Sequence, residues 1–288
     1  MQQKKWLDEK TEIPTNKLTQ PRANSTNILY TILIKNKNIK NYFVDIMDKK
    51  ELINNGKVKS VYTTDNDDAV IIEFRDDMTA GDGARKEVMN KKGSYNALIS
   101  TKLFKVLENQ GIKTQFIDLP ETNVMIAKKL EMIPIEVIVR NIATGSLIRK
   151  YPIADGTKLE PPIVQMDFKD DEFHDPMLND SIIKALGLAT QDEIDELTQL
   201  ALKINKILSE FFLEAGIILV DFKVEFGKDK DNNIILGDEI SPDSCRLWDS
   251  ETLDMLDKEL FRKGKDDEVM DAYVEVYNRI IPENERSL

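Results

Sequence analysis

The sequence predicts an α+β fold for the larger part of the chain. Strand-like segments at Lys57–Tyr62 and Ala69–Phe74 are separated by the turn sequence TTDNDD. A long amphipathic helix is predicted at Thr190–Ala215, and a hairpin should pair Ile217–Phe226 with Ile234–Ile240 around GKDKDNN. Because the chain has 288 residues, it can form one large domain or two tightly packed ones.

The helix at Thr190–Ala215 has the clearest ends, since Thr190 and Glu193 match a capping box and Gly216 follows the last turn. The other elements are, in chain order, a helix at 94–110 ended by Gly111, strands near 123–130 and 134–142, an irregular stretch rich in Pro and Asp at 152–178, and helices at about 251–262 and 267–281. Helices and strands therefore do not alternate regularly, as expected for an α+β protein.

Residues 1–46 differ from the rest of the chain. They are rich in Lys, Asn, Thr and Gln, with one apolar run at Ile28–Ile34, and they lack the rhythm of turns and strands. Met47 then opens MDKKELINNGKVKSVY, which is typical of the start of a domain. Two explanations remain open: these residues form a mobile N-terminal extension, or Met47 is the biological start and they are not part of the native protein.

Composition excludes several function classes. The net charge is -12 and the pI about 4.8, so a diffuse basic surface for nucleic acid is not expected. The run Ile28–Ile34 is far shorter than the ~20 residues that span a bilayer, so no membrane partner is expected either. Cys245 is the single cysteine, which excludes an intrachain disulfide and a cysteine-based zinc site and fits a cytoplasmic location.

The strongest chemical pattern is ILVDFKVEFG at 218–227. Side chains alternate along a strand, so Asp221, Lys223 and Glu225 share one face, opposite an apolar face. Across the predicted hairpin, Asp238 should lie within a residue or two of Glu225. Two such carboxylates repel each other unless a cation lies between them, and magnesium prefers an oxygen pair completed by water and nucleotide phosphates. A solvated sheet face with alternating charge is the competing interpretation.

A second pattern, IPIEVIVRNIATGS at 133–146, ends an apolar strand with Arg140 and follows it with Gly145 and Ser146. A guanidinium beside a Gly-Ser turn suits a phosphate monoester, because it offers paired N–H donors and close backbone approach. The alternative is an ordinary surface ion pair at the end of a strand.

Two weaker patterns lie nearer the N-terminus. In NNGKVKSVY, Lys57 and Lys59 should point the same way along a strand and could cover phosphates, although the segment matches neither a P-loop nor GxGxxG. In MTAGDGARK, a tight loop presents Asp82, or is simply a turn. His174, the single histidine, is expected to be structural, and Cys245 to be a packing residue rather than a nucleophile.

Together these segments resemble the SAICAR synthetase family. IPIEVIVRNIATGS and ILVDFKVEFG are similar to two signature segments of that family, and GDEISPDSCRLWD to a third. NGKVKSVY resembles the family's N-terminal lysine loop, and AGDGARK and FHDPM also match. The resemblance covers about residues 47–285. It departs in the lysine loop, where Val58 replaces the usual Ala and two Asn residues precede Gly56.

The resemblance implies two α+β layers with an ATP cleft between them, whose nucleotide half is related to protein kinases and glutathione synthetase. The implied subdomains are 47–132, with the ATP-binding lysine loop, and 133–288, with the substrate and metal sites. The implied activity is the ATP-dependent joining of L-aspartate to carboxyaminoimidazole ribonucleotide in de novo purine synthesis. It proceeds through an acyl phosphate and requires Mg²⁺, and the family commonly forms homodimers.

Carried over residue by residue, the resemblance implies the following roles: catalysis by Lys223 and Asp221; ATP binding by Lys57, Lys59, Lys128, Glu131, Glu225 and Asp238, with adenine near 130–133; substrate binding by Asp82, Arg140, Ser146 and Arg246; and metal binding by Glu225 and Asp238. Two other functions remain open: a small-molecule kinase with the same ATP-binding half, and a non-catalytic nucleotide-binding regulator. The sequence contains neither an HRD-type nor a DFG segment, which disfavours the kinase.

We expect a chain that begins at Met47 to fold and to keep its full activity, because residues 1–46 carry no pattern of core or site residues. Urea unfolding and activity assays of the two chain lengths test this. A loss of more than about 1.4 kcal/mol in the free energy of unfolding, a tenfold change in the equilibrium constant, would contradict it.

Overall fold

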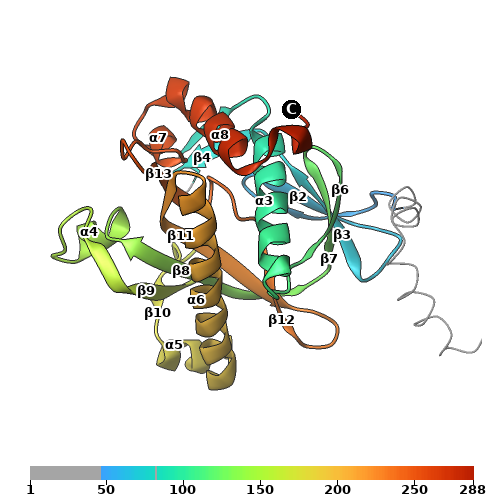
Figure 1. The fold of residues 1–288 in the computed structure, drawn as a ribbon. Coiled ribbons are helices and arrows are strands. Elements are labelled where there is room, and N and C mark those ends of the chain that lie inside the picture. The colour runs from blue at the N-terminus through green and yellow to red at the C-terminus, as the bar shows by residue number, and fades with distance from the viewer. Residues whose placement is uncertain (1–46, 82) are drawn as a thin grey trace, which may run out of the picture. The chain divides into compact units, whose positions relative to one another are not determined.

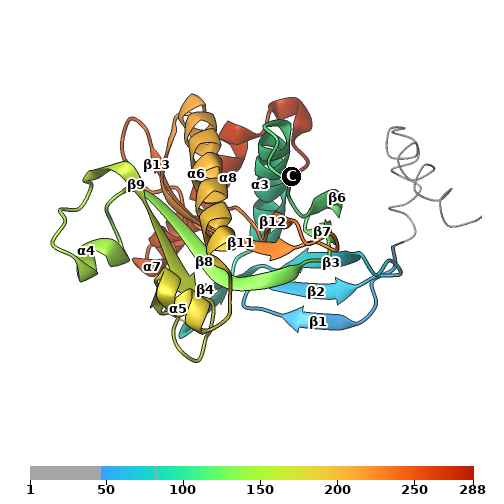
Figure 2. The same ribbon diagram turned by 90° about the horizontal axis from the view of Figure 1, so that it is seen from below.

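The computed structural model describes residues 47–81 and 83–288, which form two large antiparallel sheets and a small two-stranded one; three long helices cover one side of the large sheets (Figures 1 and 2). The predicted α+β class is confirmed. The proposed extension at 1–46 lies outside the described residues. Within the described part of the chain, no helix combines the length and the apolar character needed to span a membrane.

The first sheet has the order β1-β2-β3-β7-β6 and is packed against helix α3 (Lys92–Asn109). Its strands are β1 (Leu52–Asn55), β2 (Lys59–Thr63), β3 (Ala69–Phe74), β6 (Phe116–Glu121) and β7 (Val124–Lys128). The predicted strand at 57–62 thus begins two residues later than expected, because Gly56, Lys57 and Val58 form the connection from β1.

The second sheet has the order β10-β9-β8-β11-β12, and β13 also pairs with β11. Its strands are β8 (Glu131–Ile142), β9 (Lys158–Phe168), β10 (Met177–Leu178), β11 (Ile217–Lys228), β12 (Ile234–Gly237) and β13 (Cys245–Asp249). Helix α6 (Gln191–Glu214) packs on β11 and β8. The chain passes from the first sheet to the second between β7 and β8. The subdomain division at 132 stays a prediction.

Two sequence predictions were wrong. The stretch 152–178 contains the eleven-residue strand β9, although Pro161 and Pro162 argue against a strand. The register of β8 against β9 is interrupted at this point, between the pairs Arg140–Ile163 and Ile142–Lys158, so the missing N–H groups interrupt the ladder only locally. Residues 251–258 are not helical, because the final helical region begins only at Glu259.

Helix α6 has the predicted ends. The Thr190 side chain accepts a hydrogen bond from the backbone N–H of Glu193, and the Glu193 carboxylate accepts one from the backbone N–H of Thr190. This capping box satisfies two N–H groups that the helix itself cannot pair. At the other end, Gly216 follows the C-cap with a positive φ of 71°.

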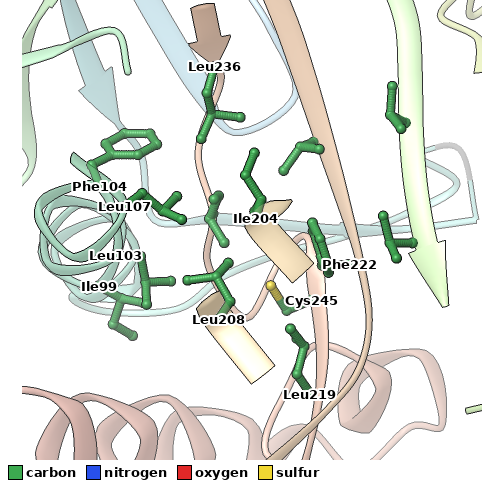
Figure 3. Packing of buried hydrophobic residues seen from close by; sticks show 14 of the residues in the cluster. Ile99, Leu103, Phe104, Leu107, Ile204, Leu208, Leu219, Phe222, Leu236 and Cys245 are labelled. Atoms are coloured by element: carbon green, nitrogen blue, oxygen red, sulfur yellow. The ribbon is translucent and has the colours of Figure 1, made fainter. Parts of the chain in front are cut away.

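The helices and both sheets share one hydrophobic core. Figure 3 shows Leu103 and Leu107 of α3 and Leu208 of α6 in this core, together with Phe222 of β11. Helix α8 (Asp266–Ile280) packs beside α3 and closes the same core. The remaining short elements are β4 (Asp77–Ala80), β5 (Arg85–Val88), α4 (Ser146–Lys150), α5 (Asp180–Ala185), α7 (Glu259–Arg262) and the 3-10 helix η1 (Glu283–Glu285).

The two sheets are also joined directly. Leu236 of β12 accepts a hydrogen bond from the backbone N–H of Gln115 (2.9 Å) and donates one to the carbonyl of Lys113 (3.1 Å). The segment before β6 therefore continues the ladder of the second sheet at its β12 edge. The hairpin of β11 and β12 is held from both sides.

We expect Gly93→Ala to lower the free energy of unfolding by about 1–2 kcal/mol, measured by urea unfolding. A Cβ at Gly93 would lie 2.5 Å from the backbone oxygen of Phe74. Alanine favours a helix over glycine by up to about 1 kcal/mol, but overpacking against backbone costs about 1–3 kcal/mol. As a control, Asn109→Ala on the exposed side of α3 should change stability by less than about 0.5 kcal/mol. An unchanged urea midpoint for Gly93→Ala would contradict this prediction, because it would mean that α3 moves away from Phe74 without loss of stability.

Candidate functional site

Two adjoining cavities lie where the two sheets meet. The first, about 410 Å³, is named here the arginine cavity and is lined by Arg140, Ser146, Asp221 and Arg246 together with Gly81 and Gly83. The second, about 600 Å³, is named the lysine cavity and is lined by Lys59, Lys128, Lys169, Glu225, Asp238 and Glu239 together with apolar residues of β2 and β3. The residues that line both are Lys57, Thr79, Glu136, Lys223, Asp243, Ser244 and Lys258.

Three neighbouring strands bring the arginines together. Asp221 of β11 lies opposite Arg140 of β8 and opposite Arg246 of β13. One oxygen of its buried carboxylate, Oδ2, accepts hydrogen bonds from Arg140 Nη1 (3.0 Å) and Arg246 Nη1 (2.8 Å). Arg140 Nη2 also donates to Ser146 Oγ (3.1 Å). Asp221 thus holds the two guanidinium groups side by side at the wall of the cavity.

Gly145 permits this arrangement. Its φ is +59°, and a Cβ at this position would lie 2.5 Å from Arg246 Nη2. The Gly-Ser turn predicted beside Arg140 is therefore also the surface on which the Arg246 guanidinium lies.

Both guanidinium groups remain charged. Burial lowers the pKa of Arg140, and Asp221 opposes this effect. Burial also disfavours the charged form of Arg246, but Asp221 and Glu259 outweigh it and raise its pKa. Arg140 Nε is buried and has no hydrogen-bond partner in the described part of the protein. Two adjacent cations, a hydroxyl and an unused donor suit an anion with several oxygens.

Lys223 stands between the two cavities. Its ammonium group donates to Glu136 Oε1 (2.5 Å), and Glu225 Oε1 lies 3.5 Å away. Burial alone would lower the pKa of Lys223, but Glu225 and Glu136 outweigh burial and raise that pKa above its usual range. The two carboxylates therefore favour the protonated, cationic form of Lys223.

Glu136 had not been identified from the sequence. It lies opposite Glu225 in the ladder of β8 and β11, and it interrupts the otherwise apolar run at 133–139. This acidic residue within an apolar run was the sequence signal that could have identified Glu136 as a site residue.

The register predicted for the two acidic residues is confirmed to within one position. Glu225 is paired with Gly237, so Asp238 is the next residue along the chain. Their partners are lysines: Glu225 forms ion pairs with Lys169 and Lys223, and Asp238 forms one with Lys59. The expected repulsion between the carboxylates is thus relieved by ammonium groups.

Glu239 is a further buried carboxylate of this cluster that sequence reasoning missed, although it directly follows Asp238. It forms an ion pair with Lys59. Burial alone would raise the pKa of Glu239, but Lys59 outweighs it and lowers that pKa to about 2.

The other predicted site residues are placed as follows. Lys57 lies in the connection from β1 to β2 and donates to Asp171 Oδ1 (2.8 Å). Lys128 lines the lysine cavity and donates to the carbonyl of Thr114 (2.8 Å). Glu131 is exposed at the start of β8, and its neighbours Leu130 and Met132 line the cavity.

Asp82 lies outside the described residues. His174 is exposed and lines neither cavity. Cys245 is buried among core residues (Figure 3), and burial raises the pKa of its thiol, which argues against a nucleophile. No three acidic, histidine or cysteine side chains among residues 47–81 and 83–288 converge to hold a metal ion by themselves.

A buried polar cluster supports the loop between β12 and β13. The carboxylate of Asp243 forms an ion pair with Lys92 of α3, accepts a hydrogen bond from Asn96 Nδ2 (2.9 Å) and accepts another from Tyr273 Oη (2.5 Å). Lys92 and Tyr273 are fully buried. This cluster ties the loop that carries Asp238 and Glu239 to α3 and α8.

Comparison with known proteins gives a consistent result. The family model described as SAICAR synthetase matches residues 52–280. A phosphoribosylaminoimidazole-succinocarboxamide synthase of Methanobrevibacter smithii is 91% identical over 240 residues, which cover 83% of this chain and 99% of that protein. The synthase of the same name from Methanocaldococcus jannaschii is 58% identical, over 76% of this chain and 90% of the relative.

Among solved structures, a type-2 SAICAR synthetase in complex with ADP superposes with a TM-score of 0.79 at 47% identity. The match covers 83% of this chain and all of the other.

Proposed function

Because the chain belongs to the SAICAR synthetase family and is therefore an ATP-dependent ligase of purine biosynthesis, we propose that its two joined cavities carry out the reaction of that family. ATP, carboxyaminoimidazole ribonucleotide and L-aspartate would give the succinocarboxamide, ADP and phosphate. The observation that supports this proposal is that Lys223 lines both the arginine cavity and the lysine cavity. A phosphate-ester site and a nucleotide site would thus meet at one cation.

The reaction requires the nucleotide site and the ribonucleotide site to adjoin each other. A carboxylate is a poor acyl donor, so one of its oxygens first attacks the γ-phosphorus of ATP and ADP leaves. The amine of aspartate then attacks the acyl carbon, and phosphate leaves with the oxygen that it acquired. Phosphoryl transfer between anions depends mainly on alignment and on neutralisation of charge. Lys223, held protonated by Glu136 and Glu225, would supply that charge beside the reacting carboxylate.

In the arginine cavity, Arg140, Arg246 and Ser146 would bind the 5′-phosphate of the ribonucleotide. The support is the pair of guanidinium groups on Asp221 and the buried Arg140 Nε, which lacks a partner in the described part of the chain. Asp221 contacts both arginines, which favours a positioning role over direct catalysis. Asp82 would contact the ribose or imidazole, and this role rests on the family resemblance alone.

In the lysine cavity, Lys57, Lys59 and Lys128 would bind ATP, with adenine against residues 130–133. A Cβ at Gly227 would lie 2.8 Å from Leu130 Cβ, and one at Gly237 would lie 3.0 Å from Met132 Cε. These two glycines therefore let the connection between the sheets lie close to the β11–β12 hairpin. Glu131 would contribute to ATP binding through its position in this connection, because its own side chain is exposed.

The residues present fit a magnesium ion bound together with a nucleotide. Magnesium takes oxygen ligands, usually one or two carboxylates completed by water and phosphate. Glu225 and Asp238 offer two carboxylates from adjoining positions of one hairpin, and both line the same cavity. When bound, the ion would neutralise phosphate charge. The two carboxylates would hold it after exchanging their present lysine partners.

The homodimer expected from the resemblance and the cytoplasmic location expected from the single cysteine remain predictions. So do the alternatives of a small-molecule kinase and a regulator, and no contact in the cavities favours either of them. The test of the proposed function is ADP release, measured with each of the other two substrates omitted in turn. We expect ADP to form over repeated turnovers only when both L-aspartate and the ribonucleotide are present, because aspartate must consume the acyl phosphate before the next ATP can react. A kinase or a regulator would be indifferent to aspartate, and that result would refute the assignment.

We expect Arg140→Ala to raise the KM for the ribonucleotide far more than the KM for ATP. Loss of one charge-assisted contact of about 1.5–3 kcal/mol corresponds to roughly a 10-fold to 100-fold change. Steady-state kinetics with each substrate varied would measure it. Arg149→Ala, an exposed arginine on α4 outside both cavities, is the matched control and should change neither constant. A larger effect on ATP would overturn the phosphate assignment.

We expect Glu225→Gln and Asp238→Asn each to lower turnover by about 10²–10³ without unfolding the protein. Lys223 keeps Glu136 as a partner when Glu225 is neutralised, and Lys59 keeps Glu239 when Asp238 is neutralised. Thermal melting without ligand should therefore change little, whereas the stabilisation by magnesium-ATP should shrink.

Asp231→Asn, which removes an exposed charge from the turn of the same hairpin, is the control for this pair. Full turnover in both Glu225→Gln and Asp238→Asn would mean that these carboxylates only neutralise lysines.

A further inference from the structure

The backbone around Lys258 is fixed on both sides. Lys258 directly precedes the short helix α7, and its N–H donates to the carbonyl of Pro242 (3.2 Å). The neighbouring Asp257 is fully buried and accepts hydrogen bonds from the N–H groups of Leu247 (2.8 Å) and Glu259 (2.7 Å). The position from which the Lys258 side chain extends is therefore set by the second sheet.

Lys258 differs from the other cations at the junction of the cavities. Three cationic side chains line both cavities: Lys57, Lys223 and Lys258. Lys57 is paired with Asp171, and Lys223 with Glu136. The ammonium group of Lys258 makes no hydrogen bond or ion pair with any residue in 47–81 or 83–288.

The surroundings of Lys258 leave its charge incompletely balanced. Burial lowers its pKa, and Asp243 opposes this effect only in part. The carboxylate of Asp243 is already engaged by Lys92, Asn96 and Tyr273. A cation that is partly removed from water without a full partner is costly, so an anion that enters beside it is bound more strongly.

The reaction decides which anion fits. In the function proposed above, Arg140 and Arg246 would bind the ribonucleotide phosphate, and Lys59 would bind the nucleotide phosphates. Lys223 would face the ribonucleotide carboxylate. The remaining anionic groups are the two carboxylates of the amino acid, whose carbons lie two and three bonds from the attacking nitrogen. They must therefore lie close to the acyl carbon beside Lys223, where the cavities join.

We propose that Lys258 binds a carboxylate of the amino-acid substrate at the junction of the arginine and lysine cavities. This proposal rests on the function proposed above. It makes Lys258 a determinant of specificity for a dicarboxylic amino acid, distinct from the groups that bind the two phosphorylated substrates.

The test is Lys258→Met, which keeps the length of the side chain and removes the charge. With each substrate varied in turn, the KM for L-aspartate should rise about 10-fold to about 100-fold, since a hydrogen bond to a charged group is being lost. The KM values for ATP and the ribonucleotide should stay within about threefold, because their contacts are retained. Lys258→Arg, which keeps the charge, should recover part of the affinity for aspartate.

A binding measurement supplements the kinetics. In the presence of ADP and the ribonucleotide, succinate, a dicarboxylate without an amine, should raise the melting temperature of the wild-type protein. It should not raise that of Lys258→Met. Lys263→Met is the matched control, because Lys263 is exposed at the end of the same helix and lines neither cavity. It should behave as the wild type in both measurements.

Two results would overturn the proposal: an unchanged KM for aspartate in Lys258→Met, or a larger rise in the KM for ATP, which would assign Lys258 to the nucleotide. If Lys258→Met does not fold, Lys258→Gln is judged by the same two criteria. Wild-type protein that forms no product from aspartate would instead refute the function proposed above, so the two failures are distinguishable.

Discussion

The alternation of side chains along β11 is the constraint on which the site depends. Phe222, Val224 and Phe226 are buried in the core, which fixes the strand in register. The intervening positions, Asp221 and Lys223 among them, must then face the cavities. Because β8, β12 and β13 all pair with β11, the arginines and the acidic residues of those strands are delivered to the same place. A slip of one residue would send every charged side chain into the core.

Burial of so many charges is tolerable because acids and bases of the site neutralise one another. Lys59 pairs with Asp238 and Glu239. Arg140 and Arg246 share Asp221, and Arg246 also pairs with Glu259. A charged group that is removed from water without a partner is far more costly than one within a pair. A complex of a nucleotide with a divalent cation carries both signs of charge. It would replace these internal pairs with equivalent ones, so that binding leaves no carboxylate and no lysine uncompensated.

Sequence reasoning succeeded where local pattern decides the structure. The ends of α6 and the near-register of Glu225 with Asp238 follow from capping and alternation alone. Sequence reasoning failed where contacts between distant segments decide the structure. The pairing of Lys59 with Asp238 joins residues 179 positions apart, and no local signal specifies it. Strand β9 was missed because its two prolines outweighed its apolar residues in the pattern, although β8 alongside it stabilises the strand.

The bonds between Leu236 and the segment at 113–115 have a mechanical consequence. Many two-sheet nucleotide enzymes open and close by rotating about the connection between their halves. Here hydrogen bonds join the sheets at a second point, next to the hairpin that carries Glu225. This second junction prevents a simple hinge rotation of one sheet against the other. The two sheets therefore form one stiff frame around the cavities.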